Sequence, residues 1–112
     1  MNSGSTFPLA LLGWVFTGLL LVLLIACVAA GQGVLRRNHV FGVRFPAMMR
    51  SDAAWRRGHL AGVLPAGIAF AVAAICSTVG LSVPLAYGGT IVAFVGGVIW
   101  VVLRASRAAG PA

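Results

Sequence analysis

The chain has 112 residues, of which 61% are hydrophobic and only 8% are charged. This composition is far from that of soluble globular domains, so it argues against a water-soluble fold and predicts one domain in a membrane. The eight basic residues are all arginine, the single acid is Asp52, and the net charge is +7. Arginines beside long apolar segments indicate membrane topology and attraction to anionic headgroups. We therefore expect a lipid bilayer as partner and no direct contact with nucleic acid.

The first predicted element is a membrane-spanning helix over about residues 8–30. No charged side chain precedes Arg36, and the segment is almost wholly apolar. Because a helix rises 1.5 Å per residue, about 20 apolar residues cross a hydrocarbon core of ~30 Å. The segment is long enough for one crossing.

Residues 31–59 hold most of the charge and are predicted to form the loop that connects the first two helices. The residue before Pro46 is restricted to extended backbone, so the middle of this loop should not be helical. Ser51 is suited to cap the N-terminus of a following helix, and the helix dipole favours Asp52 in its first turn. At i, i+4 spacing Trp55 and His59 share one face of that helix. Asp52 and Arg56 share another, where they are candidates for a weak exposed ion pair.

The same loop is unusually apolar for a segment surrounded by water. Its large apolar side chains are Val40, Phe41, Val43, Phe45, Met48 and Met49. Arg44 lies among them, where an unpaired guanidinium is costly, so we expect it to reach a phosphate or a buried acceptor. We therefore expect an ordered cap on the bundle, with Trp55 shielded inside it.

A second uncharged stretch, residues 60–103, is too long for one crossing. As a single helix it would measure about 66 Å, about twice the hydrocarbon thickness. Residues 80–84 are of turn-favouring types, and Pro84 cannot donate the backbone hydrogen bond of a continuing helix. The predicted elements are helices over about 60–80 and 85–103. The expected fold is thus an all-α membrane protein with three transmembrane helices in one domain, 1–112.

The arginines also predict the orientation. None precedes the first helix or lies in the turn at Ser82, six lie in the first loop, and two follow the last helix. They are Arg36, Arg37, Arg44, Arg50, Arg56, Arg57, Arg104 and Arg107. Positive connections stay in the cytoplasm, so the N-terminus is expected outside and the loop and C-terminus inside. The expected location is the inner (plasma) membrane of a bacterial cell.

Small residues predict which helices pack closely. They recur every four residues on the second and third helices, at Ala69, Ala73 and Ser77 and at Gly89, Ala93 and Gly97. Small side chains let two helix backbones approach closely in a membrane. We therefore expect the second and third helices to form a close hairpin.

Residues for catalysis and metal binding are scarce. His39 and His59 are the only histidines and Asp52 is the only acid, so neither an ordinary zinc site nor an acid–base pair can be assembled. Cys27 and Cys76 fall at different depths in apolar runs and are predicted to be free thiols. We expect no enzyme activity, no cofactor and no metal.

One pattern in the loop resembles a known family. The spacing Asn-x3-Gly-x-Arg-x-Pro, followed by Trp-x3-His, is similar to the signature loop of the SdpI family of bacterial membrane proteins. These positions are Asn38, Gly42, Arg44, Pro46, Trp55 and His59. One helix before the loop and a hairpin after it also resemble the short, single-domain form of that family. The resemblance implies that the six residues form a motif that binds a partner.

Two functional hypotheses follow. The namesake of the SdpI family is an immunity protein against a secreted peptide toxin and also holds a transcriptional repressor at the membrane. The resemblance therefore implies an immunity or signal-transduction protein that protects against or senses a membrane-active peptide and presents a basic loop to a cytoplasmic regulator. The alternative is a structural or accessory subunit of a larger membrane complex, favoured by the small size and the small-residue helix faces. A transporter would need a charged residue on its path, and none occurs within 60–103.

Overall fold

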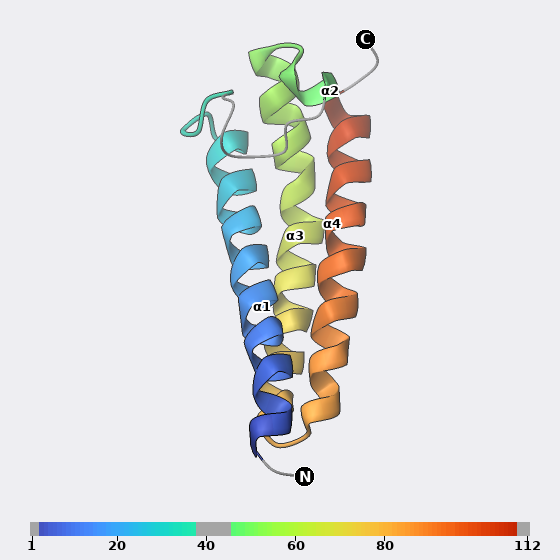
Figure 1. Ribbon diagram of the computed structural model, residues 1–112. Coiled ribbons are helices and arrows are strands. Elements are labelled where there is room, and N and C mark those ends of the chain that lie inside the picture. Colours follow the sequence, from blue (N-terminus) through green and yellow to red (C-terminus); the bar gives the residue numbers. More distant parts are fainter. Residues whose placement is uncertain (1–2, 38–45, 110–112) are drawn as a thin grey trace.

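The structure is a computed structural model that describes residues 3–37 and 46–109. Three long helices lie side by side: α1 (Ser3–Gly31), α3 (Asp52–Gly80) and α4 (Tyr87–Ala109) (Figure 1). The short helix α2 (Pro46–Met49) lies at one end of the bundle, and the 3-10 turn η1 (Pro84–Ala86) joins α3 to α4 at the other. Helix α3 packs against both α1 and α4 and is the central element of the bundle.

The outer surface of the bundle is apolar. Each long helix contains a stretch long and apolar enough to cross a membrane, Phe7–Gly31, Asp52–Gly80 and Pro84–Ala109. Only 22–33% of the most apolar window in each is buried inside the bundle, and side chains such as Ile75 and Val92 are 64% and 72% exposed. An apolar surface of this extent is stable in hydrocarbon and not in water. The chain is therefore an all-α, multi-pass membrane protein, as its composition predicts.

The helices follow the predicted order, with longer ends. Helix α3 starts at Asp52, about two turns before the expected residue 60. Its N-cap is Ser51, whose extended backbone (φ −158°, ψ 165°) brings the side-chain oxygen within 3.0 Å of the Ala54 amide that donates to it. The predicted cap is thus confirmed, and it extends α3 into the expected loop. Helix α4 likewise continues past 103 to Ala109.

Small residues set the distance between α3 and α4. Gly97 packs directly on the Ala69 methyl group, so a side chain at 97 would overlap it. A Cβ atom at Gly89 would lie 2.8 Å from the Cys76 sulfur. The predicted close hairpin of the second and third long helices is confirmed.

Three hydroxyl groups join the long helices inside the membrane-spanning region. Thr17 of α1 lies 3.0 Å from Ser77 of α3, which lies 2.9 Å from Thr90 of α4. The Thr17 hydroxyl donates to the Gly13 carbonyl at 2.8 Å, so the Ser77 hydroxyl donates to Thr17. The single Thr90 proton is then shared between Ser77 and the Ala73 carbonyl, which lies 3.3 Å away. All three side chains are buried, and interhelical bonds of this kind contribute on average about 0.6 kcal/mol each. These hydrogen bonds join all three long helices at one depth of the membrane-spanning region.

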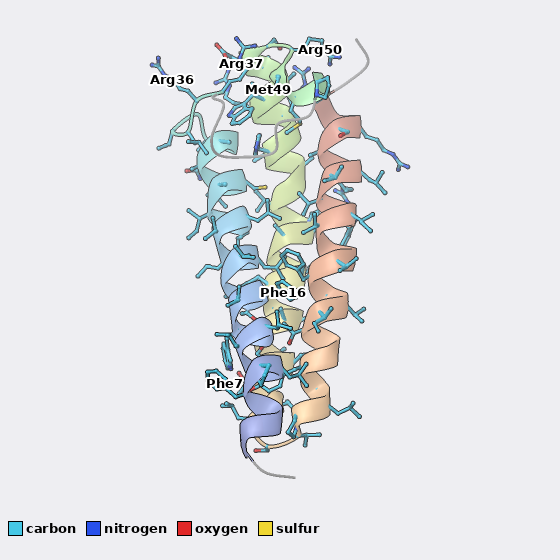
Figure 2. All side chains as sticks on the ribbon, in the orientation of Figure 1. Phe7, Phe16, Arg36, Arg37, Met49 and Arg50 are labelled. Carbon is cyan, nitrogen blue, oxygen red and sulfur yellow. The ribbon has the colours of Figure 1, made fainter. Side chains whose placement is uncertain are left out.

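Aromatic packing and the two thiols complete the interior. Phe16 of α1, labelled in Figure 2, stacks on Phe94 of α4 with ring centroids 4.5 Å apart. Tyr87, at the start of α4, is buried against Gly13 and Gly80. Both cysteines are free, as their different depths predict.

Candidate functional site

The arginines of the described residues gather at one end of the bundle, here called the arginine end. The C-termini of α1 and α4 and the N-terminus of α3 lie at this end (Figure 1). Arginines that are distant in the sequence therefore lie at the same end of the bundle. Figure 2 shows Arg36, Arg37 and Arg50 at this end beside Met49, with Phe7 toward the opposite end. The other described arginines there are Arg56, Arg57, Arg104 and Arg107.

Trp55 fixes the segment that follows α1. Its side chain is 1% exposed, and its indole Nε1 donates a hydrogen bond of 2.9 Å to the Leu35 carbonyl. A buried indole needs apolar neighbours for its ring and an acceptor for its single N–H donor. Trp55 has both at this position. The first turn of α3 is thereby tied to the C-terminal side of α1, and the predicted shielding of Trp55 is confirmed.

His59 lies one turn further along α3 and packs on Trp55. The two ring centroids are 4.2 Å apart, and His59 Nδ1 lies 2.7 Å from the Trp55 carbonyl oxygen. A carbonyl can only accept, so Nδ1 carries the proton in this bond. His59 is fully buried. The i, i+4 spacing correctly predicted that these two motif residues share a face.

Helix α2 inserts one side chain under the arginine end. Pro46 begins α2, a position where its missing N–H leaves no helical bond unmade. Met48 is fully buried and lies against Gly58, where any side chain would overlap its sulfur. A Cβ atom at Gly58 would also lie 2.9 Å from the Ala105 carbonyl oxygen. Gly58 therefore lets α2, α3 and α4 meet.

Arg37 joins the end of α1 to the turn between α2 and α3. Its Nη1 donates to the Met49 carbonyl at 2.7 Å, and its Nε lies 3.6 Å from Asp52 Oδ1. Asp52 thus pairs with Arg37, and the expected partner, Arg56, is wrong. The reason is that Arg37 is already positioned by Met49 beside the start of α3. The Asp52 side chain is 82% exposed, so the ion pair itself adds little stability.

Two arginines cap the C-terminus of α4. Arg50 Nη2 donates to the Ala109 carbonyl at 2.7 Å, and Arg57 donates to Ala108 at 3.3 Å and to Ala109 at 3.0 Å. The last carbonyls of a helix have no intrahelical donor, and the negative end of its dipole attracts cations. The hydrogen bonds to the last carbonyls and the attraction of the helix dipole both stabilise the two arginines at this helix end.

One apolar core connects this end to the membrane-spanning bundle. Met48 and Trp55 share a buried cluster with residues of α1 and of α4, namely Cys27, Ala30, Val101, Ala105 and Ala109. We call the assembly of residues 33–37, α2 and the first two turns of α3 the cap. Because the cap contacts α1 and α4 directly, a shift of either helix would alter its packing.

The six motif positions divide into two groups. Asn38, Gly42 and Arg44 lie outside the described residues, so the acceptor expected for Arg44 and the order expected for that part of the loop stay predictions. Pro46, Trp55 and His59 are described and all belong to the cap. The sequence did not reveal that arginines form hydrogen bonds at the arginine end of the bundle, because membrane topology alone is enough to explain arginines at these positions. Among the described residues no three His, Cys, Asp or Glu side chains lie close enough to hold a metal.

Fold and cap together define a class of small multi-pass membrane protein, with three helices and a packed, arginine-rich cap at one end. Residues 34–104, more than half of the chain, match the SdpI/YfhL protein family. The chain belongs to the SdpI/YfhL protein family, as the loop motif indicates. The matched region contains all six motif positions. No curated protein and no solved structure gives a significant match.

Proposed function

We propose that this protein is a membrane immunity and signal-transduction protein of the SdpI type. It would protect against or sense a membrane-active peptide and present its basic cap to a cytoplasmic regulator. The observation that supports the proposal is the match of residues 34–104 to a family of membrane proteins of the immunity type. The proposal includes no enzymatic step and no cofactor.

The proposed orientation places the arginine end in the cytoplasm of a bacterial cell and the N-terminus outside. Its support is the gathering of the described arginines at one end of the bundle, because positive residues are retained on the cytoplasmic side. The regulator would then meet a surface rich in guanidinium groups. A partner surface with carboxylates would complement it.

The proposed mechanism is a change in helix packing that reaches the cap. A peptide that enters the bilayer can pack on the exposed apolar faces of the bundle and favour one arrangement of the helices. Trp55 of the cap packs in one buried cluster with Cys27 and Ala30 of α1, and Arg57 of the cap donates hydrogen bonds to the end of α4. A relative movement of α1 or α4 would therefore change the geometry of the basic surface.

Protection can be measured in a sensitive bacterium that expresses the chain alone. We expect a higher inhibitory concentration for at least one peptide in a panel of membrane-active peptides. Trp55→Ala should lose this protection while still reaching the membrane, whereas Trp100→Ala, at a 38% exposed site on α4, should keep it. Unchanged sensitivity to the whole panel in cells that contain the protein would contradict the immunity proposal.

The alternative is an accessory subunit of a larger membrane complex. It is favoured by an apolar groove of about 210 Å³ on the outer surface of α3 and α4, where Ala93 and Gly96 leave room for another helix. Gly96 has no neighbouring atom within 4 Å of an added Cβ. On this alternative, Gly96→Leu would release the chain from a complex isolated in mild detergent. Survival of protection in the same variant would favour the immunity proposal.

A further inference from the structure

A polar cavity of about 380 Å³ lies at the arginine end, between residues 33–37 and the first turns of α3. Three arginines line it, Arg36, Arg37 and Arg56, together with one acid, Asp52. The lining therefore carries a net charge of +2. Such a cavity is complementary to an anion, and guanidinium groups bind phosphate through paired, directed hydrogen bonds.

The walls of this cavity are built by interactions within the cap. The indole of Trp55 holds the Leu35 carbonyl at 2.9 Å, and Gly33 turns the chain with a φ of +82°, which a side chain would disfavour. The Arg56 side chain runs past this turn, with its Cδ 3.6 Å from the position of a Cβ at Gly33. Arg37 is held by the Met49 carbonyl. Arg37 and Arg56 are thus positioned before any ligand binds.

An apolar groove of about 300 Å³ adjoins the polar cavity. It is lined only by apolar side chains of α1 and of the segment after it, among them Val22, Ile25, Ala29 and Val34. Leu35 lines both the groove and the cavity, so the two are neighbours at that residue. From Ala29 back to Val22 the groove follows α1 for about 10 Å, away from the arginine end.

We propose that the cavity and the groove together bind one anionic phospholipid of the surrounding leaflet. The phosphate would lie among Arg36, Arg37 and Arg56, and one acyl chain would lie along α1 in the groove. The cavity alone would suit free phosphate, but the adjoining groove matches a ligand whose charged and apolar parts are joined. A cationic peptide would be repelled by the arginines. This proposal goes beyond the proposed function and does not depend on it.

Binding can be measured by native mass spectrometry of the full chain in a neutral detergent. The probes are phosphatidylglycerol, phosphatidylcholine with the same acyl chains, glycerol phosphate and inorganic phosphate. We expect one phosphatidylglycerol per chain, bound about tenfold or more tightly than phosphatidylcholine. Both lipids carry the phosphate, but the choline cation of phosphatidylcholine would be repelled by the net positive lining. Equal binding of the two lipids, or displacement of phosphatidylglycerol by equimolar inorganic phosphate, would overturn the proposal.

Paired variants separate a built site from general attraction to positive charge. The double variant Arg36→Gln and Arg56→Gln should weaken phosphatidylglycerol binding about tenfold or more. Its control, Arg104→Gln with Arg107→Gln, removes the same charge from the same end outside the cavity and should change binding less than about twofold. Ala29→Trp should fill the groove and weaken the binding of phosphatidylglycerol without changing the binding of glycerol phosphate. Equal losses in the two double variants would show nonspecific adhesion and contradict the site, provided both retain the helical circular dichroism of the parent.

Discussion

At the residue scale, Trp55 connects the sequence motif to the architecture. It is the largest buried side chain of the chain that the structure describes, and its one polar atom bonds to the segment after α1. His59 adds a second bond, to the carbonyl of Trp55 itself. A tryptophan and a histidine four residues apart therefore act as one packed unit. The packing and the hydrogen bond between these two residues explain why the motif places them four residues apart.

We predict that Trp55→Phe lowers the stability of the protein in detergent by about 1–3 kcal/mol, because the partly buried Leu35 carbonyl loses its donor and the ring loses volume. Hydrogen exchange of residues 33–37 should become faster in the same variant. Trp100→Phe, on the outer surface of α4, should change the stability by less than about 0.5 kcal/mol. It should leave the hydrogen exchange of residues 33–37 unaltered. Equal effects of the two substitutions would show that the indole bond is unimportant.

At the scale of helices, α3 is defined by the neighbours on its two sides. Its small residues accept α4 at close distance. Its first turns bond to the segment after α1 through Trp55 and to the end of α4 through Arg57. The hydroxyl of Ser77 continues the same role within the membrane-spanning region. We therefore expect substitutions in α3 to disturb more neighbours than substitutions in α1 or α4.

Two adjacent glycines of α4 offer a test of this packing. Gly97→Ala places a methyl group against Ala69 and should destabilise the bundle by about 1–3 kcal/mol. Gly96→Ala adds the same methyl group to an open surface and should stabilise α4 by up to about 1 kcal/mol through helix propensity. Thermal unfolding in detergent measures both. Similar midpoints for the two variants would contradict the close approach of α3 and α4.

The capping of α4 by arginines has a measurable effect on helix ends. In Arg57→Ala, the Ala108 carbonyl loses its arginine donor and the Ala109 carbonyl keeps only that of Arg50, so amide exchange within 105–109 should accelerate several-fold. Arg104→Ala removes the same charge from the side of α4. It should leave this exchange nearly unchanged. If both variants exchange alike, the arginines act through charge alone and not through these bonds.

At the scale of the whole molecule, much of the fold could be predicted from the sequence because a bilayer allows few solutions. Uninterrupted apolar runs must be helices, since lipid offers no hydrogen-bond partner to the backbone. Pro84 marked the hairpin, and Ser51 marked the start of α3, which the expected boundary at residue 60 placed too late. Periodic small residues correctly identified the α3 and α4 interface, because a spacing of four keeps them on one face.

The remaining features depend on contacts that no local pattern encodes. The pairing of Arg37 with Met49 and Asp52 follows from the path of the chain around the end of the bundle. Met48 and Gly58 meet only because α2 folds back on α3. Of the candidate site, the sequence predicted that the tryptophan and the histidine share one face of α3. It left the arginines as markers of orientation and did not reveal the bonds they make.

The central claim is that the arginine end, with its cap, faces the cytoplasm of a cell whose membrane the three helices cross. Cysteine labelling in intact cells tests it most directly, with Cys27 and Cys76 first replaced by alanine. We predict that Ser82→Cys, in the exposed turn after α3, reacts with a membrane-impermeant maleimide from outside, whereas Ala53→Cys, exposed on the cap, reacts only after permeabilisation. Labelling of Ala53→Cys from outside, with Ser82→Cys protected, would contradict the proposed orientation and with it a cytoplasmic role for the cap.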